Sequence, residues 1–215
     1  MRILKALTLT AALCGSLQAE ESALFVGAMY EMGGSTFRAK VLGEGYVPKP
    51  GKNAITQGLG VHVGYNQLFG QKGWVGLRYY AFYNWGITDF GKFVPNHKVE
   101  FTNNTFNLSG YGVGLDLLLN FINAESFSVG VFGGLAVGGN TWWLVKGNNP
   151  QTKVQWLVNG GVRTVISKRH GLELGFKVPM MHVNYVETFN GSKFNNTTLF
   201  LKRDWAFTAA YYFYF

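Results

Sequence analysis

Charged side chains recur at alternate positions within apolar segments, and they are the residues of this sequence with the clearest chemistry. Each stands on the side of its segment that carries glycine and polar residues, opposite the large apolar side chains. The acids are Glu31, Asp116 and Glu173, and the bases are Arg78, Arg163 and Lys177. An unpaired charge is costly to bury, so six enclosed charges of balanced sign are expected to pair with one another. We expect a structural lattice of ion pairs, and the alternative is a narrow, gated passage for ions.

The histidines are the other candidates for catalysis or metal binding. They are His62, His97, His170 and His182, and they share no metal-ligand spacing. A catalytic arrangement would need His182 and Glu187 to meet a serine from a neighbouring loop, and a solvated or hydrogen-bonded histidine is the default interpretation at each position. No glycine run has the spacing of a phosphate-binding loop. The sequence therefore predicts no enzyme, no metal and no cofactor.

Apolar or aromatic residues occupy every second position of eight long segments. Alternation of this kind is typical of β-strands, whose successive side chains point to opposite faces. The segments are Ala23–Gly33, Ile55–Asn66, Trp74–Asn84, Phe106–Phe121, Phe127–Gly138, Val154–Ile166, Gly171–Val178 and Leu201–Phe215. Eight strands joined by hairpins are expected to form an all-β fold, an eight-stranded antiparallel up-and-down transmembrane β-barrel.

The two faces of these segments differ in a way that favours a membrane barrel over a soluble β-sandwich. In the first segment Leu24, Val26 and Tyr30 share one face, whereas Gly27 and Glu31 share the other. A sandwich would expose many charges, but only 14% of the residues are charged, 16% are aromatic and 29 of 215 are glycine. An average soluble domain has about 25% charged residues and about 7% glycine. Inward glycines would leave room in the tightly curved interior of a small barrel.

The connections between these segments alternate between short and long. The short ones are Gln67–Gly73, Ile122–Ser126 and Ser167–Gly171. The long ones are Gly34–Ala54, Gly86–Thr105, Gly139–Lys153 and Pro179–Phe200. Outer-membrane barrels have short periplasmic turns and long extracellular loops, so the long segments are expected outside. Most of the remaining basic residues, Arg203 among them, are expected in these loops and turns.

The first 19 residues have the pattern of a cleaved signal peptide. Arg2 and Lys5 precede an apolar stretch from Ile3 to Leu13, and the segment ends on the small residue Ala19. The apolar stretch is too short to span a membrane as a helix. We therefore expect residues 1–19 to be removed and residues 20–215 to form one exported barrel domain. This domain would contain no cysteine, because Cys14 lies in the removed segment.

Several stretches resemble the Helicobacter outer membrane protein family, the Hop and Hor porins and adhesins. The matching stretches are GLGVHVGYNQLFG (58–70), WVGLRYYAF (74–82), YGVGLDLLLNFIN (111–123), SVGVFGG (128–134), QWLVNGGVRT (155–164) and HGLELGFKVP (170–179). They run through nearly the whole expected mature chain in family order. The alternate aromatic residues Tyr211, Phe213 and Phe215 also look like the carboxy-terminal signal that the barrel assembly machinery reads.

The resemblance implies a small member of the family, located in the cell outer membrane among lipid and lipopolysaccharide. Adhesins of this family bind through a large extracellular domain, and this chain lacks one. We expect a non-enzymatic barrel whose four outer loops contact host glycans or receptors or support the envelope. The alternatives are a small-solute porin and a lipid-modifying enzyme, although no histidine stands two residues before a serine as in lipid A deacylase barrels. The positive net charge of +8 is assigned to the surface, and no nucleic acid partner is expected.

Overall fold

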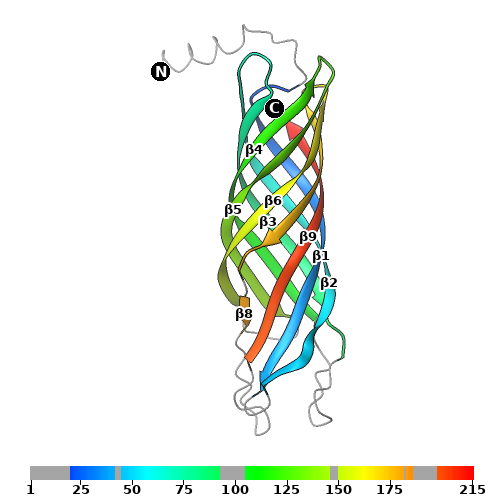
Figure 1. The fold of residues 1–215 in the computed structure, drawn as a ribbon, viewed down its shortest axis with the longest axis vertical. Coiled ribbons are helices and arrows are strands. Elements are labelled where there is room, and N and C mark those ends of the chain that lie inside the picture. Colours follow the sequence, from blue (N-terminus) through cyan, green and yellow to red (C-terminus); the bar gives the residue numbers. More distant parts are fainter. Residues whose placement is uncertain (1–19, 42–44, 93–104, 146–149, 182, 186–197) are drawn as a thin grey trace.

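The computed structural model describes residues 20–41, 45–92, 105–145, 150–181, 183–185 and 198–215, and these residues form a long barrel of tilted strands (Figure 1). The strands are β1 (Ala23–Val41), β2 (Gly45–Phe69), β3 (Val75–Asp89), β4 (Thr105–Asn123), β5 (Phe127–Leu144), β6 (Gln151–Ile166), β7 (His170–Pro179), β8 (Val183–Tyr185) and β9 (Thr198–Tyr214). No helix among these residues is long and apolar enough to cross a membrane. The expected signal peptide, residues 1–19, lies outside the described residues and stays a prediction.

The sheet closes on itself through antiparallel pairing of its first and last strands. From β1 to β7 each strand pairs with the next in the chain, and β9 pairs with β1. On its other edge β9 pairs with β7 along residues 206–213 and with the three-residue β8 along residues 199–201. Strands β7 and β8 therefore occupy successive stretches of one edge, and the ring has eight strands, as the sequence predicted. Through the middle of the barrel, each described strand pairs with a neighbour on both edges, as a lipid environment requires.

Burial alternates along the strands as the sequence pattern predicted. In β3 nearly every second side chain is buried and the intervening ones are exposed. The exposed positions carry large apolar side chains around the whole barrel, including Leu59, Val113, Leu135, Val162 and Leu174. An apolar surface that continues around every strand is expected to face lipid, because soluble monomers rarely expose such an extensive apolar surface.

The two ends of the barrel differ in the connections they carry. One end, named here the turn end, has the short connections at residues 70–74, 124–126 and 167–169, together with both ends of the described chain (Figure 1). The opposite loop end has the connections at residues 42–44, 90–104, 145–150 and 180–197, the last of which includes β8. The connections at residues 90–104 and 180–197 are long, as the sequence predicted, but the connection at residues 42–44 is as short as those at the turn end, so the expected long loop there is wrong.

Strands extend much further into the long connections than the sequence predicted. Most of the expected loop Gly34–Ala54 belongs to β1 and β2, which pair as far as Val41 and Gly45. The three other expected loops also lose residues to the flanking strands. The sequence stretches concerned lack the apolar outer face that marks a strand in lipid. In the structure their backbone hydrogen bonds continue across the hairpin, which stabilises strands without help from lipid.

A β-bulge in β9 reverses which side chains face the interior. Gly34 pairs with Trp205 but Ser35 pairs with Arg203, so Asp204 is an extra residue on β9. Beyond the bulge the odd-numbered residues face inward, and the side chain of Arg203 is buried. The expectation that Arg203 lies in a loop is therefore wrong. A bulge shifts the alternation by one residue, and nothing in the local pattern marks its position.

An apolar cluster fills the barrel interior at the loop end. Its buried side chains come from four strands and from Phe90, which follows β3; they are Phe37, Phe90, Phe106, Leu108, Trp142 and Leu201. Aromatic residues near strand ends, Trp142 and Trp143 among them, are expected to form a belt at the membrane interface, but Trp142 is fully buried in this cluster, so that expectation is wrong for Trp142. Its neighbour Trp143 takes the outward position. The sequence Trp142-Trp143 offers an indole to either face, and only the register of β5 decides between them.

Candidate functional site: the barrel interior

The guanidinium group of Arg78 lies in the middle of the interior and joins carboxylates from two other strands. Its Nη2 lies 2.6 Å and its Nε 2.9 Å from Oδ2 of Asp116 on β4. Its Nη1 donates to Oε1 of Glu173 on β7 at 2.6 Å. All three side chains are buried. Charge-assisted hydrogen bonds of this geometry are among the strongest in proteins, so Arg78 links β3, β4 and β7 across the lumen.

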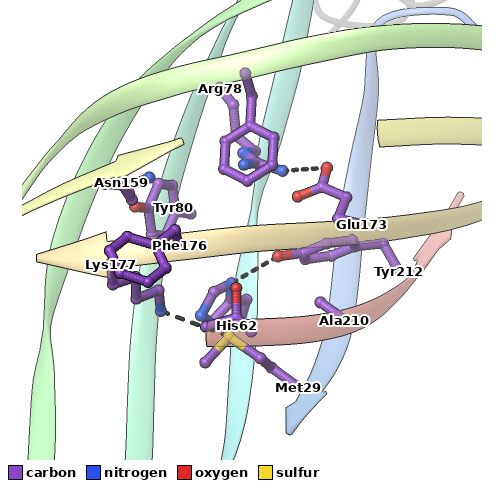
Figure 2. Close-up of a pocket in the computed structure, with 12 residues that line it drawn as sticks. Met29, His62, Arg78, Tyr80, Asn159, Glu173, Phe176, Lys177, Ala210 and Tyr212 are labelled. Atoms are coloured by element: carbon purple, nitrogen blue, oxygen red, sulfur yellow. Dashed lines mark hydrogen bonds and ion pairs between the residues drawn. The ribbon is translucent and has the colours of Figure 1, made fainter. Parts of the chain in front are cut away.

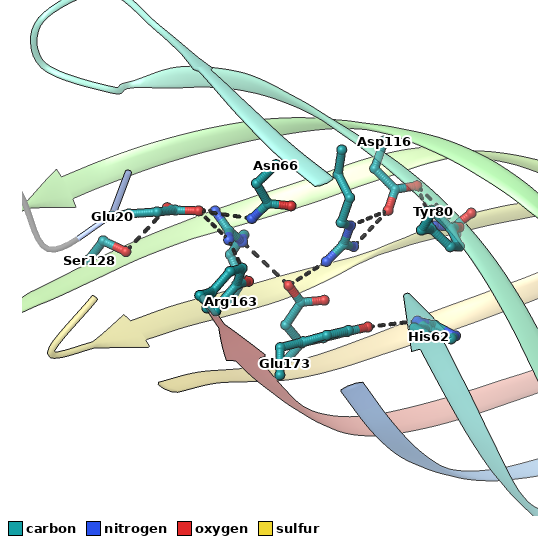
Figure 3. Close-up of polar contacts among 12 residues, drawn as sticks. Glu20, His62, Asn66, Tyr80, Asp116, Ser128, Arg163 and Glu173 are labelled. Carbon is teal, nitrogen blue, oxygen red and sulfur yellow. Dashed lines mark hydrogen bonds and ion pairs between the residues drawn. The ribbon is translucent and has the colours of Figure 1, made fainter. Parts of the chain in front are cut away.

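The same carboxylate of Glu173 continues the network toward the turn end. Nε of Arg163 lies 3.4 Å from Oε1 of Glu173. The other side of the Arg163 guanidinium group faces Glu20, with Nη2 at 2.5 Å from Oε1 and Nη1 at 2.8 Å from Oε2. Figure 3 shows this chain of contacts from Glu20 through Arg163 and Glu173 to Asp116. Five charged groups from five segments of the chain are therefore connected.

Glu20 precedes β1, yet its side chain is only 1% exposed. Besides Arg163, its carboxylate accepts hydrogen bonds from Asn66 at 3.2 Å, Asn120 at 2.8 Å and Ser128 at 3.4 Å. The segment before β1 therefore folds inward and places a carboxylate among groups from four strands (Figure 3). These contacts place a buried ion pair inside the barrel at the turn end.

A second, smaller group of charges lies further toward the loop end. Nη2 of Arg203 is 2.9 Å from Oε1 of Glu31, and Asn84 donates to Oε2 of Glu31 at 3.3 Å. Lys177 follows Glu173 by four residues along β7, and its Nζ contacts Sδ of Met29 at 3.5 Å. The Lys177 ammonium group also lies 5.6 Å from the centre of the Phe82 ring. This second group carries two cations against one carboxylate.

Hydroxyl groups separate these charges from the apolar cluster at the loop end. The side chains of Ser35, Thr56 and Thr88 are fully buried and stand on three successive strands. Their oxygens form a hydrogen-bonded row, with distances of 2.6 Å and 2.5 Å. The interior therefore passes from ion pairs through hydroxyl groups to aromatic side chains along the axis of the barrel.

Inward glycines make room for the large side chains of this interior. A Cβ atom at Gly114 would lie 2.2 Å from the ring of Tyr80, and one at Gly134 would lie 2.2 Å from Oδ1 of Asp116. Real Cβ atoms do not approach other heavy atoms so closely, so these two positions must lack a side chain for Tyr80 and Asp116 to reach the lumen. The glycine pattern of the sequence is thus part of the interior packing.

His62 is buried beside this network, as Figure 2 shows, without a catalytic partner among the described residues. Its Nδ1 is 2.9 Å from the hydroxyl of Tyr212, and its ring stacks on Tyr80 with the ring centres 5.3 Å apart. His170 contacts the hydroxyl of Tyr211 at the turn end. His97, His182 and Glu187 lie outside the described residues. Within the described part of the chain, no three His, Cys, Asp or Glu side chains are grouped to hold a metal ion.

Among the described residues, Lys177 borders two small cavities in the lumen. The first has about 20 Å³ for the centres of water-sized molecules, and its lining includes His62, Arg78 and Glu173 (Figure 2). The second has about 10 Å³ and is bordered by Arg203 and Asn140. Roughly 10–15 Å³ measured in this way is needed for one water molecule. Each cavity therefore has room for no more than a very small group.

The structure places all six charges singled out in the sequence inside the barrel and adds two that sequence reasoning missed. Glu31, Arg78, Asp116, Glu173, Arg163 and Lys177 are each at most 7% exposed. The additions are Glu20 and Arg203. Local alternation carries no signal for either residue. Glu20 precedes the first alternating segment. Arg203 belongs to the last segment, but the bulge shifts it out of the alternation that places the other inward residues of β9.

The three carboxy-terminal aromatic residues lie at the turn end with their side chains on the outer face of β9 or just beyond it. Tyr211 and Phe215 are exposed and Phe213 is half-buried. The backbone N of Phe215 donates to the carbonyl oxygen of Leu24 at 3.0 Å, which ties the last residue to β1. Their role as an assembly signal stays a prediction.

A closed barrel with an apolar outer surface and a charged, hydrogen-bonded interior defines a transmembrane β-barrel of the outer-membrane type. Residues 60–215 match the family described as Helicobacter outer membrane protein. The chain belongs to this family, and its place is therefore the outer membrane, surrounded by lipid and lipopolysaccharide. No functionally curated protein matches the chain by sequence.

Solved outer-membrane proteins are similar to this chain at low sequence identity, and of the three named here only OprG has a TM-score above 0.5. OprG from Pseudomonas aeruginosa is 13% identical with a TM-score of 0.57, over 91% of this chain and 96% of that one. Neisserial surface protein A is 15% identical with a TM-score of 0.44, over 91% and 100% of the two chains. Ail, the attachment invasion locus protein of Yersinia pestis, is 14% identical with a TM-score of 0.31, over 87% and 98%. Identities this low show the fold alone.

Proposed function

We propose that this outer-membrane protein is a sealed, non-enzymatic barrel that presents its loop end to the surroundings of the cell. There its long connections contact host glycans or receptors or support the envelope. The observation that supports a sealed barrel is the filled lumen. A conducting barrel needs a continuous aqueous path, and eight strands enclose a space just wide enough for side chains.

Obstructions lie at both ends of the interior. At the turn end, Glu20 and Arg163 join segments that are not neighbours in the sheet through two short contacts. At the loop end, the buried apolar cluster around Trp142 and Phe37 fills the interior with aromatic and aliphatic side chains. Between them the two cavities have only about 20 and 10 Å³. These features support a structural or surface-contact role over transport.

The purified full-length barrel is expected to give no steady conductance in a planar lipid bilayer. Its lumen would have to lose both obstructions before ions could cross. A general diffusion porin, reconstituted in the same way, is the positive control. Steady openings on the nanosiemens scale from the purified protein would overturn the sealed-barrel proposal.

A porin with a narrow, gated lumen is the second candidate, and the two cavities that meet at Lys177 favour it. If rare openings are seen, substitution of Arg78 or Arg163 should change the preference for cations or anions, because both side chains face the lumen. Unchanged ion preference would place the openings outside the barrel interior.

Protease added to intact cells is expected to cleave this protein within the long connections at residues 90–104 or 180–197 and to spare the short connections at the turn end. The long connections of outer-membrane barrels face outward, so only they are accessible before lysis. Mass spectrometry of the released peptides would locate the cuts, and lysed cells provide the control. Cleavage of intact cells at residues 70–74 or 167–169 instead would reverse the orientation and contradict a role for the loop end outside the cell.

A further inference from the structure

Lys177 is a buried cation without a carboxylate partner among the described residues. The residue is 7% exposed, and its ammonium group contacts the Met29 sulfur and the Phe82 ring. The buried carboxylates pair with arginines instead. A buried ammonium group needs an opposite charge or strong acceptors to offset its lost hydration. The contacts to sulfur and ring are weaker than either.

Arg203 adds a second cation to the wall of a cavity that Lys177 also borders. It lies within ion-pair distance of Glu31 through Nη2, yet neither Nη2 nor Nε has a hydrogen-bond acceptor in the described part of the chain. Donor groups of two buried cations are thus available beside one small space.

Amide side chains complete the lining of this cavity. Asn84, Asn140 and Gln155 border it. Oδ1 of Asn84, whose Nδ2 donates to Glu31, and Oδ1 of Asn140 both lack a hydrogen-bond donor among the described residues. The two ends of an amide are assigned from their partners, so reversing Asn140 turns a donor toward the same wall. Amide donors and two cations together form a lining suited to a negative ion.

The distribution of charge along the lumen also favours a bound negative ion at this cavity. Toward the turn end, the carboxylates of Glu20, Asp116 and Glu173 outnumber the guanidinium groups of Arg78 and Arg163 by one. Toward the loop end, Lys177 and Arg203 outnumber Glu31 by one. These eight charges cancel only over the whole barrel, and the surplus cation lies at the cavity.

We propose that Lys177 and Arg203 form an anion-binding site in the lumen that takes one small inorganic anion of the size of chloride. About 10 Å³ for the centres of water-sized molecules excludes a phosphate or a carboxylate metabolite and fits a group close to water in size. The bound anion neutralises the surplus cation and accepts hydrogen bonds that Glu31 leaves unmade. The site does not depend on whether the lumen conducts.

The test compares thermal unfolding of the purified full-length barrel in sodium chloride and in sodium gluconate at equal ionic strength. Gluconate is too large for the cavity, so only chloride should stabilise the barrel through the site. The unfolding midpoint is expected to be about 3–6 °C higher in chloride when chloride exceeds its dissociation constant tenfold. Lys177→Met should abolish this difference. Lys168→Met, which removes an exposed cation paired with Glu21 at the turn end, should retain it.

Crystals of the unaltered barrel grown with bromide in place of chloride give a second readout that does not depend on a variant folding. An anomalous peak beside Nζ of Lys177 is expected. Equal midpoints in the two salts, a chloride effect that persists in Lys177→Met, or water without an anomalous peak at the cavity would each overturn the site.

Discussion

Substitution of Arg78 by methionine is expected to lower the free energy of unfolding by about 3–5 kcal/mol, the range typical when one partner of a buried ion pair is removed. Methionine keeps much of the side-chain volume but leaves Asp116 without its cation and Glu173 with only the 3.4 Å contact to Arg163. The measurement is reversible urea unfolding of the refolded barrel, followed by tryptophan fluorescence and by the mobility of folded and unfolded forms on gels.

Two further variants separate loss of the ion pair from loss of packing. Arg78→Met combined with Asp116→Asn removes the uncompensated carboxylate, so the double variant should be more stable than Arg78→Met alone. Arg169→Met changes an exposed arginine in the turn after β6 and should stay within about 0.5 kcal/mol of the unaltered protein. If Arg78→Met is as stable as the unaltered barrel, Arg78 does not hold β3, β4 and β7 together.

Glu20→Ala is expected to lower the free energy of unfolding by a similar amount, about 3–5 kcal/mol, although Glu20 precedes the first strand. The substitution removes the carboxylate that contacts both terminal nitrogens of Arg163 and accepts from Asn66, Asn120 and Ser128. Among its ion pairs, Arg163 would keep only the longer contact with Glu173. The same urea unfolding measurement applies.

The adjacent residue offers a matched control for Glu20. Glu21 also pairs with a cation, Lys168, but both of these side chains are more than two-fifths exposed. Exposed ion pairs contribute about 0–1 kcal/mol, so Glu21→Ala should have little effect. Equal losses in the two variants would mean that the segment before β1 is not anchored in the lumen.

The position of Glu20 in the mature chain also bears on the ion pair at the turn end. If Glu20 is the first residue after removal of the predicted signal peptide, the beginning of the mature chain would itself supply the carboxylate of this ion pair. Edman sequencing of the protein from outer membranes would establish that start. A start elsewhere would leave the contacts of Glu20 unchanged but would make it an internal anchor.

The alternation of residue types is enough to predict most of the fold. Each of the eight segments alternates over at least eight residues, and the side-chain period of a strand is two, so the faces of Leu59 and His62 or of Leu174 and Glu173 follow directly. The six interior charges follow from the same alternation. The family resemblance rests on short motifs in a fixed order, and the match over residues 60–215 confirms it.

Alternation does not predict the positions where the strand register changes or where apolar residues stand on both faces. The bulge at Asp204 turns Arg203 inward, and the register of β5 buries Trp142 instead of Trp143. The lengths of β1 and β2 were underestimated, because the sequence after Gly33 and before Ile55 lacks the alternating apolar residues from which strands were predicted. Backbone pairing across the hairpin, which stabilises these stretches, has no local signature in the sequence.

By itself, the sequence determined that this chain forms a membrane barrel with enclosed charges of balanced sign, because strand period and composition are local properties. Only the tertiary structure decided which charges meet. Arg163 and Glu20 are 143 residues apart, and Arg78 and Glu173 are 95 residues apart. Their contacts depend on ring closure and on register, which bring distant strands around one lumen. The same closure leaves Lys177 and Arg203 at one cavity, with no carboxylate within ion-pair distance of Lys177 among the described residues, and a local pattern contains no information about that arrangement.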